Sequence, residues 1–268
     1  MKNYRERLKD AETIVIKVGT STITYETGKL NLGHLEKLAF VISDIRNLGK
    51  KVVLVTSGAI GVGVNKLGLK EKPGVMSEKQ AAAAIGQCEL MHIYNKMFSK
   101  YGYVVGQILL TREEIDFEER RNNVINTFSK LLEYNAIPVV NENDSIAVEE
   151  IEFGDNDTLS AIVSKLIGAD LLIILSDIDG LYSADPRTDP EAKLIPVVEE
   201  INDEVEKSAG GAGSGRGTGG MVTKLMAARI ATQAGTDVVV ANGGNPCIIQ
   251  DIISGQDSGT LFVAQPSS

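Results

Sequence analysis

Leu171-Leu172-Ile173-Ile174-Leu175 is the stretch that decides the fold, because five consecutive apolar residues leave no polar face. A strand that is apolar on both faces is typical of a parallel sheet covered by helices on both sides. Similar runs occur at 52–55 (Val-Val-Leu-Val) and at 237–241 (Asp-Val-Val-Val-Ala). We therefore predict an α/β protein, a three-layer α/β/α sandwich with a mostly parallel central sheet.

Strand and helix patterns alternate along the whole chain. The predicted strands are 13–18, 51–56, 104–110, 137–140, 171–175, 237–241 and 260–263, and the predicted helices are 32–48, 77–98, 120–134, 158–166, 222–234 and 248–253. Ser77 with Gln80 and Thr111 with Glu114 have the spacing of a capping box. The segment 182–201 is rich in turn residues, and we interpret it as an excursion rather than a linker, so residues 1–268 form a single domain.

Composition excludes several classes of protein. A net charge of −9 over 268 residues gives a surface that repels nucleic acid and anionic membranes. We find no apolar run of transmembrane length, and residues 2–10 are too charged for a signal peptide. Two cysteines (Cys88, Cys247) and two histidines (His34, His92) give no disulfide framework and no metal-binding pattern. We expect a cytoplasmic protein without a side-chain metal site.

The segment from Gly210 to Gly220 contains seven glycines in eleven residues, and a periodic apolar stretch with Lys224 follows at once. Backbone N–H groups at the start of a helix attract anions, and glycine lets a phosphate approach them closely. A flexible Gly/Ser linker is the alternative, but it would not need Lys224 or an amphipathic helix so close behind. No Walker A motif is present, since neither Gly28-Lys29 nor Gly49-Lys50 precedes Ser or Thr.

Polar residues gather where the predicted strands end. Lys17 lies inside a buried strand, which is costly unless the charge is paired or used. Other strand ends carry Ser57-Gly58, Asp144, Asn156-Asp157 and Ser176-Asp177. Each taken alone could be a helix cap, a turn or a loop residue. Together, at successive strand ends of one sheet, they indicate a ligand site.

Six segments carry a family resemblance, in the order IVIKVGTS (14–21), VTSGAIGVG (55–63), VVNENDSI (139–146), FGDNDTLSA (153–161), LSDIDGLYSADPR (175–187) and GTGGMVTKLMAA (217–228). The chain resembles the amino acid kinase superfamily and, within it, the glutamate 5-kinase (γ-glutamyl kinase) family. The second, third and fourth segments point to that family, whereas the others are shared more widely. The resemblance covers the chain from about residue 14 to residue 263.

The resemblance implies a reaction and a set of site residues. ATP would phosphorylate the side-chain carboxylate of L-glutamate, the first step of proline biosynthesis, with Mg²⁺ bridging the phosphates and no dedicated side-chain cage for it. Lys17, Lys224 and Asp157 would act in catalysis, with Asp157 between the two lysines. Glutamate would be held by Ser57, Gly58, Asp144 and Asn156. ATP would be held by Lys17, Ser176, Asp177, Thr218, Gly219, Gly220, Met221, Val222, Thr223 and Lys224.

The resemblance also implies an organisation and partners. The part at about 1–167 would bind glutamate and the part at about 168–264 would bind ATP. Proline would inhibit the enzyme, a glutamate-5-phosphate reductase would consume the labile product, and the chain would form a homo-oligomer. Many bacterial members carry a further C-terminal PUA domain, and we expect this chain to be the short form without it.

Two alternatives stay open. The first is a sister kinase for N-acetylglutamate, aspartate, carbamate or UMP, although Asp144 would have no charge to pair on an acetylated amine. The second is a non-catalytic nucleotide-binding sensor on the same fold. Such a sensor would be expected to lose Lys17, Lys224 or Asp157, and all three are present.

Overall fold

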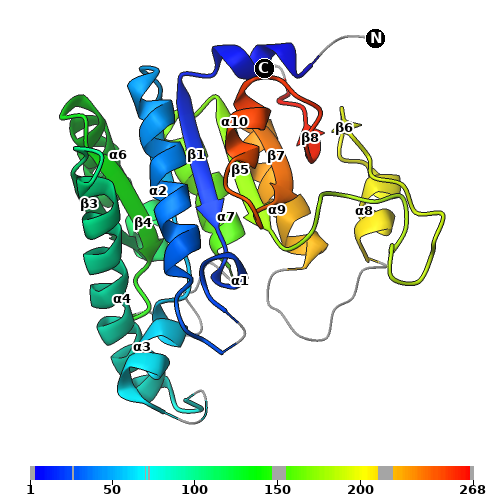
Figure 1. The fold of residues 1–268 in the computed structure, drawn as a ribbon. Helices are drawn as coiled ribbons and strands as arrows, with labels where there is room; N and C mark the ends of the chain where they lie inside the picture. The colour runs from blue at the N-terminus through cyan, green and yellow to red at the C-terminus, as the bar shows by residue number, and fades with distance from the viewer. Residues whose placement is uncertain are drawn as a thin grey trace.

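A computed structural model describes residues 4–25, 27–69, 71, 73–146, 155–210 and 220–265. In this part of the chain the strands form one eight-stranded sheet in the order β3-β4-β2-β1-β5-β7-β8-β6 (Figure 1). All neighbouring pairs are parallel except β7 and β8. The strands are β1 (Thr13–Val18), β2 (Lys51–Val55), β3 (Val105–Leu110), β4 (Ile137–Glu142), β5 (Leu171–Ser176), β6 (Val197–Val198), β7 (Asp237–Asn242) and β8 (Thr260–Phe262).

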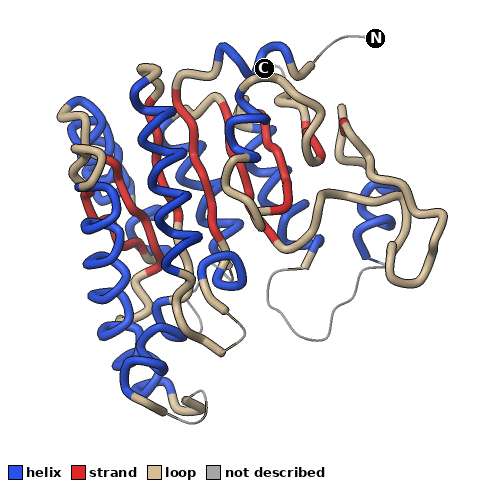
Figure 2. The backbone as a smooth tube through the Cα atoms, in the orientation of Figure 1, coloured by secondary structure: helices blue, strands red, loops and turns tan. Residues whose placement is uncertain are grey.

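Helices cover both faces of the sheet (Figure 2). On one face Ile14, Ile16 and Val18 of β1 share a core with α2 (Leu32–Asn47), α4 (Met76–Ser99) and α10 (Ile248–Ile253). On the other face Val15 shares a core with α6 (Glu118–Glu133), α7 (Asn156–Ile167) and α9 (Met221–Gln233). The alternation of side chains along a strand explains why both faces are apolar. The predicted sandwich is confirmed.

Several short elements were not predicted from the sequence, because each is too short or too polar to show a repeating apolar pattern. These are η1 (Glu6–Asp10), α1 (Thr20–Ile23), α5 (Arg112–Asp116), α8 (Asp203–Gly210) and β6. The capping box of Thr111 and Glu114 is confirmed at the start of α5. The box predicted for Ser77 and Gln80 is wrong, because α4 begins at Met76 and its N-cap is Val75. A further helix, α3 (Ala59–Leu67), follows the Ser57-Gly58 turn.

The strand order places a switch point at β1. From β1 the chain builds β2, β3 and β4 on one side, and it then returns to build β5 against the other edge of β1. Ligands of open α/β sheets bind beyond the carboxyl ends of the strands at such a point. The carboxyl ends of β1, β2 and β5 are therefore where the topology favours a site.

Helices α3 and α4 pack without side chains between them at two glycines. A Cβ built on Gly63 would lie 1.8 Å from the carbonyl oxygen of Ala82, and one on Gly86 would lie 1.8 Å from that of Ala59. Only glycine permits this approach. The contact brings the middle of α4 against the start of α3, next to the carboxyl end of β2.

The N-terminal segment is hydrogen-bonded to the segments that precede β6 and β8. The buried guanidinium of Arg5 donates hydrogen bonds of 2.8–3.2 Å to the carbonyl oxygens of Pro196, Gln256, Ser258 and Gly259. Across the described residues, we find no helix with the length and apolar character needed to cross a membrane.

Candidate active site at the carboxyl edge of the sheet

Lys17 is the one charged residue of the central strand β1, and it lies on the face that α7 and α9 cover. Its side chain alternates with Ile16 and Val18, so it projects toward α7 and α9 as Val15 does. The residue is 8% exposed. A buried ammonium group requires a partner of opposite charge.

Asp157 supplies that partner from the first turn of α7. Its Oδ1 atom lies 2.6 Å from Lys17 Nζ, and its Oδ2 atom lies 3.1 Å from Lys224 Nζ in the first turn of α9. Asp157 is 1% exposed and Lys224 is 3% exposed. We call these three residues the charged cluster. The structure thus places Asp157 between the two lysines, and their catalytic roles stay a prediction.

The electrostatics of the charged cluster follow from this geometry. Burial alone raises the pKa of Asp157, but the ammonium groups of Lys17 and Lys224 outweigh burial and hold the pKa below its usual range. The carboxylate is therefore ionised at neutral pH. Two ammonium groups and one carboxylate leave one net positive charge, which suits an anionic ligand.

The start of α9 adds backbone donors beside this charge. Its N-cap is Gly220, which makes no side-chain cap, so the N–H groups of the first turn are not met by a capping side chain. Thr223 Oγ1 lies 3.1 Å from Asp157 Oδ2 and 2.9 Å from the carbonyl oxygen of Gly220. Uncapped helix starts of this kind bind phosphate. Met221 and Val222 lie in the same turn, whereas Thr218 and Gly219 lie outside the described residues.

The end of β5 carries Ser176 and Asp177, which are predicted to bind ATP. Ser176 closes the strand and its hydroxyl donates to Asp177 Oδ1 at 3.0 Å. Just beyond, Asp179 accepts hydrogen bonds from Asn242 Nδ2 at 2.9 Å and from the Tyr182 hydroxyl at 3.0 Å. These contacts fix the loop between β5 and the 182–201 segment at the same edge of the sheet.

A second group of polar side chains lies at the ends of β2 and β4. Asn156 Nδ2 lies 2.8 Å from Ser57 Oγ, 2.9 Å from the Thr56 carbonyl oxygen and 3.0 Å from Asn141 Oδ1, and these three acceptors share its two hydrogens. Asn141 Nδ2 in turn donates to Gln87 Oε1 at 2.9 Å. We call Thr56, Ser57, Gln87, Asn141 and Asn156 the amide network. The amide network brings together Ser57 and Asn156, two of the residues predicted to bind glutamate.

The other two residues predicted to bind glutamate, Gly58 and Asp144, lie at the same carboxyl edge of the sheet. Gly58 has φ of +94° and is the N-cap of α3, and a Cβ there would meet the Thr20 side chain at 3.3 Å. This left-handed conformation favours glycine. Asp144 lies in the turn after β4, beside Asn143, whose Oδ1 accepts from the Ser145 hydroxyl at 2.6 Å.

Gln87 is a polar residue that the sequence interpretation missed. It lies in the middle of α4 on the buried stripe of Ala83, Leu90 and Tyr94, and it is 7% exposed. A lone amide at helical spacing among small and apolar residues was the available signal, because a buried amide needs a hydrogen-bond partner. The structure shows Asn141 buried between Gln87 and Asn156.

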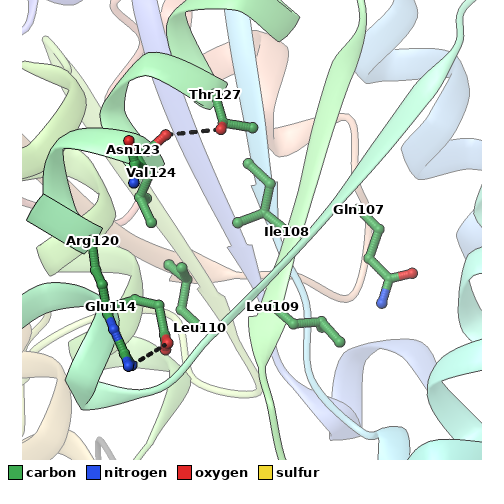
Figure 3. A pocket seen from close by; sticks show the side chains of 9 residues that line it. All are labelled: Gln107, Ile108, Leu109, Leu110, Glu114, Arg120, Asn123, Val124 and Thr127. Carbon is green, nitrogen blue, oxygen red and sulfur yellow. Dashed lines mark hydrogen bonds and ion pairs between the residues drawn. The ribbon is translucent and has the colours of Figure 1, made fainter.

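In the described ranges we find no group of three or more His, Cys, Asp or Glu side chains arranged to hold a metal ion. A surface hollow of about 470 Å³ lies between edge strand β3 and helix α6 (Figure 3). A second hollow, of about 600 Å³, lies along α6. Arg120 and Glu114 form an ion pair at one end of the first hollow. The lining residues of the two hollows come from β3, α5 and the helix α6 with its C-cap Tyr134, and include no residue of the predicted site, so we assign them no function.

Comparisons with known proteins agree with this geometry. The model of the amino acid kinase family matches residues 12–242. A glutamate 5-kinase from Clostridium perfringens is 61% identical over 97% of this chain and 98% of its own length. A glutamate 5-kinase from Listeria innocua is 56% identical over 97% of this chain and 96% of its own length. Among solved structures, an isopentenyl phosphate kinase substrate complex is 19% identical with a TM-score of 0.68, over 94% of this chain and 99% of its own, and shows the shared fold.

The chain therefore belongs to the amino acid kinase family, and it is a kinase. Its identity to curated relatives along nearly their whole length is far higher than its identity to other branches of the fold. Within that family the chain belongs to the glutamate 5-kinases.

Proposed function

We propose that this chain transfers the γ-phosphoryl group of ATP to the side-chain carboxylate of L-glutamate, giving L-glutamate 5-phosphate and ADP. The observation that carries the proposal is the pair of buried ammonium groups, Lys17 and Lys224, held on the two oxygens of Asp157. This reaction is the first step of proline biosynthesis. Its family assignment rests on the relatives described above.

The chemistry needs no general base, because a carboxylate is already a nucleophile. A carboxylate oxygen forms the new bond to the γ-phosphorus, and the bond from that phosphorus to the β,γ-bridging oxygen breaks, so ADP leaves with the electron pair. Catalysis then consists of positioning and charge stabilisation. Lys17 and Lys224 neutralise charge on the transferred group, and Asp157 positions both ammonium groups.

The ATP phosphates fit the start of α9. The first-turn N–H groups of Met221, Val222 and Thr223 follow an N-cap glycine, and Lys224 adds a full charge. Ser176 and Asp177 would contact the nucleotide from the end of β5, and Thr218 and Gly219 would complete the phosphate loop. Mg²⁺ would enter with ATP and neutralise phosphate charge, since the described residues offer no cage of their own.

Glutamate would lie on the other side of the charged cluster. Ser57, Gly58, Asp144 and Asn156 come from the ends of β2 and β4 and from the start of α7. Asp144 suits the substrate ammonium group. On this assignment residues of about 1–167 supply the glutamate side and residues of about 168–264 supply the nucleotide side, within one domain and one sheet.

Regulation and partners follow from the same assignment. Proline would compete at the glutamate side, a glutamate-5-phosphate reductase would take up the labile acyl phosphate, and the chain would act as a homo-oligomer. A cytoplasmic location, with no nucleic-acid or membrane partner, is consistent with the net charge of −9 and with two free cysteines.

Acyl phosphate formation tests the proposal directly. The purified protein is given ATP and Mg²⁺ with glutamate, N-acetylglutamate, aspartate or carbamate, and hydroxylamine traps the acyl phosphates formed from the three carboxylic acids as hydroxamates, while ADP release reports carbamate turnover. Turnover with glutamate, suppressed by proline, is the expected result. Preference for another acid would overturn the substrate assignment, and absence of turnover from folded, ATP-binding protein would overturn the reaction.

A further inference from the structure

The amide network has a fixed direction of hydrogen bonding, which two backbone groups impose. The N–H of Glu142 donates to Asn141 Oδ1 at 2.9 Å, so the Asn141 Nδ2 atom must be the one that faces Gln87. The Thr56 carbonyl accepts from Asn156 at 2.9 Å, so the nitrogen of Asn156 must face this group. A backbone N–H cannot accept and a carbonyl cannot donate, so neither asparagine amide can flip.

This direction determines what Ser57 can do. Its oxygen accepts a hydrogen bond from Asn156 Nδ2 at 2.8 Å, which leaves the hydroxyl hydrogen available. Among the described residues we find no hydrogen bond donated by the Ser57 hydroxyl. A Ser57 hydroxyl held in this way is a donor, and a donor complements a carboxylate.

Gln87 lies at the other end of the network and receives its only hydrogen bond within the described structure from Asn141. Its Oε1 atom is the acceptor that satisfies the Asn141 amide, which is itself 1% exposed. Without that acceptor the buried Nδ2 atom of Asn141 would lose its partner, which favours rotation of the side chain away from Asn156. The Nε2 atom of Gln87 is buried and has no partner within the described structure.

We propose that Gln87 is a positioning residue for the amino-acid substrate. It holds the amide of Asn141, and through it the amide of Asn156, so that the Ser57 hydroxyl donates to a substrate carboxylate. The proposal rests on the proposed function, since it assumes glutamate at this side. Gln87 acts through Asn141 and Asn156.

The test replaces Gln87 by Met, which has a similar length and no acceptor oxygen of comparable strength. We expect Gln87→Met to raise the KM for glutamate about tenfold, the size of one hydrogen bond of roughly 1.4 kcal/mol. The KM for ATP and kcat should change less than twofold. A merely structural role would instead shift both KM values and the melting temperature together.

Two further variants sharpen the result. Gln87→Glu keeps an acceptor oxygen toward Asn141 and should restore most of the glutamate KM. If Nε2 of Gln87 bound a substrate carboxylate directly, Gln87→Glu would instead be worse than Gln87→Met, and the positioning role would be wrong. Asn95→Leu removes an exposed amide from the same helix and should leave both KM values unchanged.

The outcomes separate the two proposals. Absence of glutamate turnover by the unsubstituted protein would overturn the proposed function. Normal turnover by that protein, together with an unchanged glutamate KM in folded Gln87→Met, would overturn the role of Gln87 alone. If Gln87→Met does not fold, Gln87→Glu decides, because a raised glutamate KM in that variant contradicts the positioning role.

Discussion

The charged cluster and the amide network lie next to each other at the carboxyl edge of the sheet, but they are built in different ways. In the charged cluster three ionised groups partner one another, Lys17 and Lys224 each on one oxygen of Asp157. The amide network joins neutral groups into a directed chain that ends in an available hydroxyl hydrogen on Ser57. The charged cluster supplies a net positive charge, and the amide network orients the Ser57 hydroxyl. Breaking the first should therefore cost much more than breaking the second.

The largest effect is expected for Asp157→Asn. The two buried ammonium groups would no longer face a carboxylate, and loss of one member of a buried ionic group costs about 3–5 kcal/mol of stability. Turnover should fall as well, because the lysines lose their orienting group. Chemical denaturation and the hydroxylamine assay measure the two effects. A variant as stable as the parent would contradict our view that the carboxylate holds the charged cluster together.

The same variant gives a pH test of the charged cluster. The pKa of Asp157 is lowered in the folded protein, so its stabilisation is complete above the pKa of an unfolded aspartate, about 3.9, and is lost as pH falls through the lower folded value. The stability difference between the parent and Asp157→Asn should stay constant from pH 8 to about pH 5 and shrink below about pH 3.9. Denaturation curves across this range check it, and a difference that shrank near neutrality would implicate another group.

Lys17→Met and Lys224→Met should separate activity from stability. Each should lower kcat by about 10²–10³-fold, since one group that stabilises the transferred charge is removed. Stability should fall less than in Asp157→Asn, because one ammonium–carboxylate pair remains. Single-turnover assays and thermal unfolding provide the comparison. Near-normal kcat in either folded variant would remove that lysine from the catalytic role.

A smaller effect is expected where α3 and α4 touch. Gly63→Ala places a methyl group 1.8 Å from the Ala82 carbonyl, and overpacking of this kind costs about 1–3 kcal/mol. The helix start beside Ser57 should shift, so the glutamate KM should rise more than the ATP KM. Gly61→Ala in the same helix has nothing within 4 Å and is the matched control. It should be neutral or slightly stabilising, and equal losses in both variants would point to helix propensity rather than contact.

The smallest effect is expected at a helix cap outside both groups. Thr111→Ala removes the hydroxyl that hydrogen-bonds to Glu114 Oε2 at 2.7 Å, and loss of a cap costs about 1 kcal/mol. Both KM values and kcat should stay at their parental levels. Thermal unfolding with steady-state kinetics checks this, and altered kinetics would mean that α5 communicates with the site.

Sequence patterns predicted the sheet well because its strands are apolar on both faces. The run 171–175 and the strand 13–18 leave no alternative to a covered parallel sheet, and the structure has β5 and β1 at these positions. Short elements such as α1 and β6 could not be predicted, since four and two residues are too few to show a repeating pattern.

Some residues of the site could likewise be predicted from the sequence, and others could not. Lys17 attracts attention in the sequence because a charge inside a buried strand is costly, and Lys224 because it follows a glycine-rich segment. Asp157 attracts attention because it belongs to the polar residues at successive strand ends. Gln87 does not, because its meaning depends on Asn141, 54 residues away. A directed chain of amides is visible only once the backbone groups of Thr56 and Glu142 are placed beside it.

Asn156 and Asp157 are consecutive residues in the first turn of α7, yet one belongs to the amide network and the other to the charged cluster. A ligand that displaces this turn from one side therefore changes the affinity of the other side. Thermodynamic linkage makes such a coupling reciprocal, so the factor by which glutamate changes ATP binding equals the factor by which ATP changes glutamate binding. The amide network and the charged cluster share this turn. The free-energy effects of a substitution in one group and a substitution in the other are therefore not expected to add.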